Sequence, residues 1–174
     1  MDILISSNLE RLLYLLSGGD DKLVAGYMKE LSDTGCYQVS EEMRKKIQSV
    51  FVGGFSSEAE TEATIGKMMD EHKYLIDTHT AVAFHVLEQY RKETGDQTKT
   101  VVASTASPFK FCDAVLDALN VTDKATGTAL LDQLAEVSGM PAPQPLATLK
   151  DKQVRFTSWT EKEQMRAVVT DFLK

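Results

Sequence analysis

Leucines recur at helical spacing near the start of the chain. Leu9, Leu12, Leu13 and Leu16 stand at i, i+3, i+4 and i+7, which places them on one buried face of a helix that Gly18 ends. The same periodicity, with capping residues before it and glycines after it, predicts further helices. They run from Asp20 or Asp21 to Gly35, from Ser40, over residues 57–67, from Thr78 or Thr80 to Tyr90, from Pro108, from Ala125 or Thr126 to Val137, and from about Thr160. In the helix over residues 57–67, Ser57 stands three residues before Glu60 in a capping-box pattern.

Short apolar runs separate several of these helices. They are predicted to be strands at Ile3–Ile5, Ser49–Phe55, Tyr74–Ile76 and Val101–Ala103. Because helices alternate with strands, we predict an α/β fold in which helices surround a small, mainly parallel sheet. Three or four strands make a thin sheet, so a further segment of protein is expected to complete it.

Proline marks the one predicted domain boundary. The run M-P-A-P-Q-P-L at residues 140–146 contains three of the four prolines and is expected to be extended. Residues 1–140 are therefore predicted to form one α/β domain. Residues 141–174 are predicted to form an extended connector and a C-terminal helix, with Phe172 and Leu173 packing at its end.

The composition argues against several classes of function. The chain is 43% hydrophobic and 26% charged, as is usual for soluble globular proteins. A net charge of −7 argues against nucleic-acid binding, and no apolar run approaches the roughly 18 residues of a membrane span. No secretion signal is visible, so the cytoplasm is the expected compartment. Cys36 and Cys112 are interpreted as reduced thiols, and the three histidines lack the spacing of a metal pair, so no metal site is expected.

The turn after the predicted strand at Val101–Ala103 is the main candidate site. Ser107 is the expected N-cap of the helix that Pro108 opens, and a helix N-terminus beyond a strand end attracts anions. Lys110 lies in the first turn of that helix, where its charge opposes the helix dipole unless a bound anion offsets it. A solvated lysine is the equally open alternative. Ser107 and Lys110 also fit the S-x-x-K pattern of serine acyl-transfer enzymes, but no K-T-G motif follows.

Three motifs in consistent order resemble the C-terminal part of bacterial threonine synthases. They are S-T-A-S-P-F-K-F at residues 104–111, D-T-H-T-A-V-A at residues 77–83 and S-S-N-L-E-R-L-L-Y at residues 6–14. The resemblance extends from about Met1 to about Asn120, and more loosely to Lys174. It implies the tryptophan synthase β-type fold (fold type II) and the cofactor pyridoxal 5'-phosphate (PLP). Thr78 stands where the family pattern would have proline.

The resemblance also implies roles for individual residues. Thr105 would meet the pyridine nitrogen of PLP with its hydroxyl, and Ser104 beside it would join the cofactor site. Lys110, His79 and Thr80 are candidates for binding the substrate, which the resemblance gives as O-phosphohomoserine. From the residues alone, Thr105 could equally be a hydroxyl that caps a turn.

Two parts of a complete PLP site have no match in this sequence. The Schiff-base lysine in its S-F-K-D-type motif is absent, and so is the glycine-rich loop for the cofactor phosphate, so we predict no catalytic residue here. The chain is expected to be the C-terminal part of an enzyme that makes L-threonine and phosphate from O-phosphohomoserine and water. Its partner would be the missing N-terminal half, and alone it would be inactive. The alternative is a non-catalytic α/β module that binds a phosphorylated metabolite or a protein.

Overall fold

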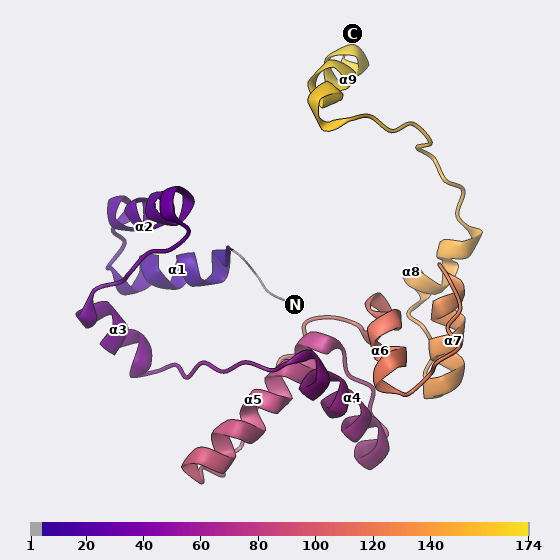
Figure 1. The fold of residues 1–174 in the computed structure, drawn as a ribbon, viewed down its shortest axis with the longest axis horizontal. Coiled ribbons are helices and arrows are strands. Elements are labelled where there is room, and N and C mark those ends of the chain that lie inside the picture. Colours follow the sequence, from indigo (N-terminus) through magenta and orange to yellow (C-terminus); the bar gives the residue numbers. More distant parts are fainter. Residues whose placement is uncertain (1–4, 174) are drawn as a thin grey trace. The chain divides into compact units, whose positions relative to one another are not determined.

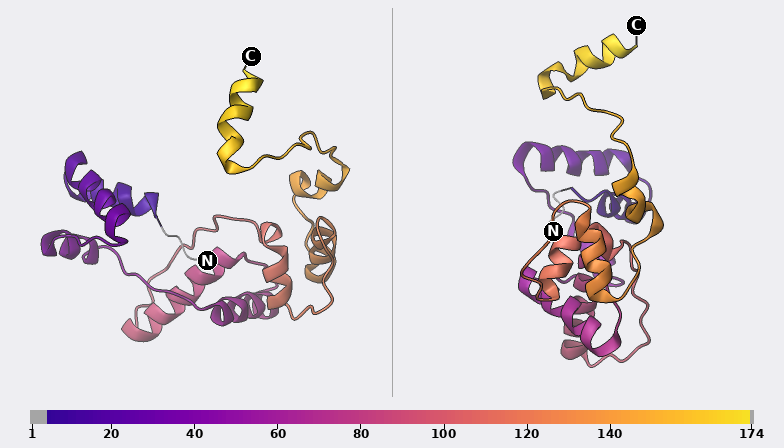
Figure 2. Two further views of the ribbon diagram at one scale, coloured as in Figure 1. Left: turned by 45° about the horizontal axis from the view of Figure 1, so that its top comes forward. Right: turned by 90° about the vertical axis from the view of Figure 1, so that its right-hand side faces the viewer.

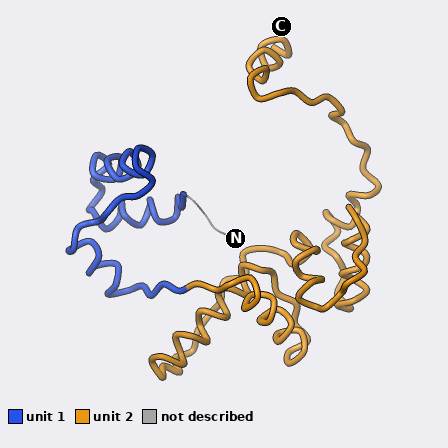
Figure 3. The backbone as a smooth tube through the Cα atoms, viewed as in Figure 1, with its two compact units in different colours: residues 1–54 blue, residues 55–174 orange. Residues whose placement is uncertain are grey.

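The computed structural model describes residues 5–173, which divide into two compact units, Met1–Gly54 and Phe55–Lys174 (Figure 3). The predicted strand at Ile3–Ile5 lies largely outside the described residues. The predicted boundary near residue 140 stays a prediction.

Unit 1 is built from three helices around a small core. Their bounds are Ser7–Leu16 (α1), Asp21–Thr34 (α2) and Glu41–Gln48 (α3). The predicted cap at Asp20 and the predicted end at Gly35 are confirmed, since the Asp20 side chain accepts a hydrogen bond from Leu23 N and Gly35 adopts a φ of 81°. The core side chains of this unit are Leu13, Val24, Tyr27 and Met43.

Unit 2 begins with two long helices and continues through shorter ones. Its α-helices are Glu58–His72 (α4), Thr78–Thr94 (α5), Cys112–Ala118 (α6), Ala129–Ser138 (α7), Gln144–Ala147 (α8) and Met165–Phe172 (α9). Three 3-10 turns accompany them, at Pro108–Lys110 (η1), Thr148–Asp151 (η2) and Lys162–Gln164 (η3). In the ribbon views α4 lies beside α5, and α4 also packs against α6, which contacts α7 (Figures 1 and 2).

One apolar core holds α4, α5, α6 and α7 together. Leu116 on α6 and Leu134 on α7 are both fully buried, as is Ile65 on α4. Leu75 and Ile76, from the segment between α4 and α5, are only 3% and 1% exposed in the same core. The segment that leads into α5 is therefore anchored by two buried aliphatic side chains, which fixes where α5 begins.

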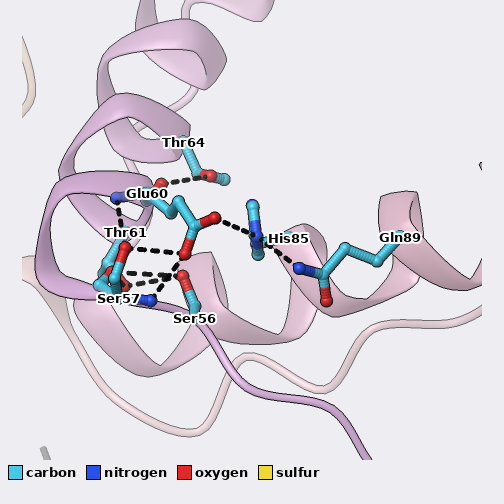
Figure 4. A network of polar contacts seen from close by, with 7 residues as sticks. All are labelled: Ser56, Ser57, Glu60, Thr61, Thr64, His85 and Gln89. Atoms are coloured by element: carbon cyan, nitrogen blue, oxygen red, sulfur yellow. Dashed lines mark hydrogen bonds and ion pairs between the residues drawn. The ribbon is translucent and has the colours of Figure 1, made fainter.

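A polar network joins the start of α4 to the middle of α5 (Figure 4). Ser57 and Glu60 form the predicted capping box: the Ser57 hydroxyl accepts from Glu60 N at 3.3 Å, and the Glu60 carboxylate accepts from Ser57 N at 2.8 Å. The other carboxylate oxygen of Glu60 lies 3.5 Å from His85 Nε2 on α5, and His85 also contacts Gln89. The cap of one helix thus also ties it to its neighbour.

The capping box makes the stability of unit 2 depend on pH. Hydrogen bonds from the Ser57 hydroxyl and backbone N–H hold the pKa of Glu60 below its ordinary value of 4.5. Since the folded-state pKa is the lower one, this stabilisation is present above the ordinary value and is lost as the pH falls through the folded-state pKa. Glu60→Gln keeps a capping side chain but cannot titrate. We expect it to flatten the loss of stability, measured by urea unfolding, as the pH falls below 4.5.

Glu62→Gln is the matched control, because Glu62 lies on the same helix and its side chain contacts no partner within residues 5–173. If the free energy of unfolding falls equally steeply with acid pH in Glu60→Gln and in the unchanged protein, this explanation is wrong.

The predicted α/β fold class is wrong for the part of the chain that the structure describes, which contains helices and no strand. Residues 101–103 form no backbone ladder with another described segment, and Val101 is 91% exposed. The predicted strand at residues 49–55 is similarly exposed and unpaired. Leu75 and Ile76 are buried, but against helices. A short apolar run indicates burial, but it does not show whether a sheet or a helix covers it. A strand also needs a neighbouring strand to pair with its backbone N–H and C=O groups, and the run itself does not reveal one.

The C-terminal region differs from the prediction in two further ways. Helix α8 begins inside the proline-rich segment that was expected to be extended. Helix α9 is present near the predicted place, but Phe172 and Leu173 are 87% and 77% exposed, so their expected packing is wrong.

Candidate functional site

The D-T-H-T motif forms the start of α5 around a buried carboxylate. Asp77 is fully buried and is the N-cap residue, and its Oδ1 accepts from His79 N at 2.9 Å and from Thr80 N at 3.4 Å. His79 Nδ1 lies 3.1 Å from the same oxygen. The other carboxylate oxygen, Oδ2, accepts a short hydrogen bond from the Thr80 hydroxyl. Helix N-termini favour such a carboxylate because their first N–H groups have no partner within the helix.

The second motif is tied to the first by its leading serine. The hydroxyl oxygens of Ser104 and Thr80 lie 3.2 Å apart, across 24 positions of sequence. Ser104 belongs to the irregular segment after α5, and Thr80 to the first turn of α5. The structure therefore brings two of the residues predicted from separate motifs into direct contact.

The S-P-F-K part of the motif continues as a tight turn and not as one long helix. The Ser107 hydroxyl accepts from Phe109 N at 3.3 Å, which confirms Ser107 as the cap, and Pro108 opens the 3-10 turn η1. The backbone then leaves helical geometry at Phe111, with a φ of −130°, before α6 starts. The Phe111 ring packs against the His79 imidazole with ring centres 5.0 Å apart. The turn is thus joined to α5 by an aromatic contact as well.

Two predicted site residues take no part in these contacts. Thr105 and Lys110 are exposed, and neither side chain has a hydrogen-bond or ion-pair partner within the part of the chain that is described. Lys110 lines an open cavity of about 600 Å³ together with Phe109, Phe111 and residues of α7. Ser104, Thr105, His79 and Thr80 do not line that cavity. The walls of the cavity are mainly apolar, so it lacks the polar groups that the two motifs bring together.

Sequence reasoning missed Asp77 as part of this site. The signal was present, since an aspartate followed by T-x-T matches an N-cap with hydroxyls in the first turn, but the residue had been assigned to the end of a strand. Cys112 also lies here, and burial raises the pKa of its thiol. Both cysteines are free thiols, as predicted.

Within residues 5–173, no group of three or more histidine, cysteine, aspartate or glutamate side chains could hold a metal ion. A separate search of the same residues finds no helix that is long and apolar enough to cross a membrane.

Comparison with known proteins identifies a family. The family model "Threonine synthase, C-terminal" matches residues 80–169, which include Thr80, Ser104, Thr105 and Lys110. Threonine synthase of Saccharomyces cerevisiae is 36% identical over 134 residues, 69% of this chain and 26% of that protein. Human threonine synthase-like 1 is 32% identical over 142 residues, 81% of this chain and 19% of that protein.

Solved structures agree with the sequence comparison. A PLP-bound threonine synthase from Brucella melitensis superposes with a TM-score of 0.72 at 32% identity, covering 99% of this chain and 32% of that one. Yeast threonine synthase gives a TM-score of 0.73 at 29% identity and covers 99% of this chain and 35% of that one. The chain spans about a fifth of the length of the threonine synthase-like 1 relatives it matches. The chain therefore belongs to the threonine synthase family, whose C-terminal region it matches.

Proposed function

We propose that this chain is the C-terminal part of a PLP-dependent lyase, a threonine synthase that converts O-phosphohomoserine and water to L-threonine and phosphate. The observation that carries the proposal is the contact between Thr80 and Ser104, because it joins the two motifs on which the family resemblance rests.

The residues of the turn fit the proposed cofactor. When bound, PLP supplies the electron sink for elimination and replacement at the substrate. In this proposal Thr105 donates its hydroxyl proton to the pyridine nitrogen, and Ser104 lies beside it. The Thr105 side chain is exposed and makes no hydrogen bond to the other described residues, so its hydroxyl is available for a ligand. A neutral hydroxyl suits an unprotonated nitrogen, whereas a carboxylate would hold that nitrogen protonated.

The proposed substrate contacts follow from charge and position. Lys110 presents an exposed ammonium group with no ion-pair partner in residues 5–173, which suits the phosphate or carboxylate of O-phosphohomoserine. His79 packs on Phe111 and keeps about a third of its side chain exposed, so it can form part of the wall of the substrate cleft. Thr80 belongs to the same wall but is only 3% exposed.

The proposed compartment is the cytoplasm. Two free thiols with no disulfide between them fit a reducing environment. We propose no nucleic-acid or membrane partner, and the proposed protein partner is the segment of threonine synthase that carries the Schiff-base lysine.

The chain of 174 residues by itself is expected to lack threonine synthase activity. The Schiff-base lysine and the phosphate loop have no match in its sequence. Incubation with PLP and reduction with borohydride should therefore not label any one lysine specifically and stoichiometrically. Mass spectrometry of the digested product measures the labelling, and yeast threonine synthase treated in the same way is the positive control. One stoichiometrically labelled lysine together with turnover of O-phosphohomoserine would overturn this expectation.

A chimera tests the proposed function directly. The matched C-terminal part of yeast threonine synthase is replaced by this chain, and formation of threonine from O-phosphohomoserine is measured. Activity above that of the yeast protein truncated at the junction supports the enzyme. A folded chimera that binds PLP but never forms threonine, or that binds no PLP, favours the non-catalytic module instead.

A further inference from the structure

Asp77 is the most completely enclosed charged side chain near the S-T-A turn. It is 0% exposed and receives hydrogen bonds from two backbone N–H groups, from the Thr80 hydroxyl and from the His79 ring. A buried carboxylate needs such a set of donors, since an unpaired buried charge is strongly destabilising. Asp77 is fully buried and cannot reach a ligand, and Thr80, at 3% exposed, offers a ligand almost no surface.

One chain of hydrogen bonds links Asp77 to the S-T-A turn. The Thr80 hydroxyl donates to Asp77 Oδ2, and it is also the donor in its contact with Ser104 Oγ, which accepts at 3.2 Å. An ionised carboxylate can only accept, whereas a hydroxyl can both donate and accept. Thr80 therefore joins the buried carboxylate to Ser104, and the hydroxyl oxygen of Ser104 is the atom of the turn that is held.

We infer that Asp77 and Thr80 are positioning residues for the S-T-A turn. They hold Ser104 by its hydroxyl oxygen and thereby fix the backbone on which Thr105, the next residue, is presented to a ligand. This inference rests on the proposed function as far as PLP is concerned, but the anchoring of the turn can be measured without any cofactor.

The first test uses the chain itself. Thr80→Val keeps the shape of the side chain and removes the hydroxyl that joins Asp77 to Ser104. We expect the backbone order parameters of residues 103–106 to fall from about 0.85 to below about 0.6 in ¹⁵N relaxation. Thr64→Val is the matched control, because Thr64 is also buried in unit 2 but donates only to the backbone carbonyl of Glu60. Unchanged order parameters in a folded Thr80→Val chain would overturn the anchoring role.

The second test measures PLP affinity in the complete enzyme. Thr80→Val is expected to raise the Kd for PLP about 3- to 10-fold, while Thr80→Ser, which restores the hydroxyl, stays within about 2-fold of the unchanged enzyme. Thr64→Val should leave the Kd unchanged. In a double-mutant cycle, Ser104→Ala should add nothing to Thr80→Val, because either change breaks the same chain of contacts. If the two changes multiply each other's effect on the Kd for PLP, they do not break the same chain of contacts, and the anchoring role is contradicted.

The two tests separate the two proposals. If the unchanged complete protein binds no PLP, the proposed function fails, and the order parameters alone decide the anchoring role. If PLP binds and Thr80→Val leaves both measurements unchanged, the anchoring role fails while the proposed function stands. Neutron diffraction also tests the chain of contacts: a Thr80 deuteron directed at Asp77 or Ser104 supports the anchoring role, and one directed at neither contradicts it.

Discussion

Thr105→Val is expected to weaken PLP binding in the complete enzyme about 5- to 150-fold, the effect of losing about 1–3 kcal/mol when a buried acceptor is left without its donor. Valine has nearly the shape of threonine, so the change removes the hydroxyl and little else. Cofactor affinity is measured by absorbance titration, and turnover of O-phosphohomoserine is followed alongside.

Two further variants make the Thr105 result interpretable. Thr105→Ser keeps the hydroxyl and should keep most of the affinity and activity. Thr126→Val makes the same chemical change at an exposed threonine of the loop before α7 and should have no effect. If Thr105→Val binds PLP as tightly as the unchanged enzyme, Thr105 is a turn residue only and the proposed cofactor contact is wrong.

Leu116→Ala is expected to lower the free energy of unfolding of unit 2 by about 2–5 kcal/mol. Leu116 lies on α6 with no exposed surface, in the core that also contains Ile65 and Leu134. Removing three carbons there leaves a cavity that the surrounding helices fill only in part. Urea unfolding followed by far-UV circular dichroism measures the change. Trp159 is a poor fluorescence reporter because it is 83% exposed.

Leu149→Ala is the matched control for the core. Leu149 is 46% exposed in η2, so the same substitution there should cost less than about 1 kcal/mol. Equal losses at the two positions would show that α6 is not part of a closed core.

Local chemistry explains which parts of the fold could be predicted from the sequence. The capping box at Ser57 and Glu60, the cap at Asp20 and the end at Gly35 each depend on hydrogen bonds within a few residues, and all were predicted correctly. Residues inside helices were harder: Leu9 and Leu13 were both expected on the buried face of α1, but Leu9 is 41% exposed and Leu13 is 1% exposed. The choice between neighbouring positions depends on where the other helices lie.

Non-local partners explain the failures. Val101 and Ile76 both belong to apolar runs that resemble strands, yet one is 91% exposed and the other 1% exposed. Nothing within either run distinguishes them, because burial depends on the helices that pack against Ile76. The site shows the same limit. Ser104 and Thr80 were predicted from their motifs, but Asp77 could be recognised as their anchor only after α5 and the turn were placed together.

The order in which unit 2 folds should follow from its local connectivity. Helix α4 packs on α5, and α6 packs on α7, so most of the contacts close only short loops. Folds of this kind cross low entropic barriers and reach the native state within about milliseconds. The bond between Thr80 and Ser104 closes a loop of 24 positions that contains little regular structure after α5. We therefore expect mutations at this pair to speed unfolding and to leave the folding rate almost unchanged, because the S-T-A turn is assembled after the rate-limiting step.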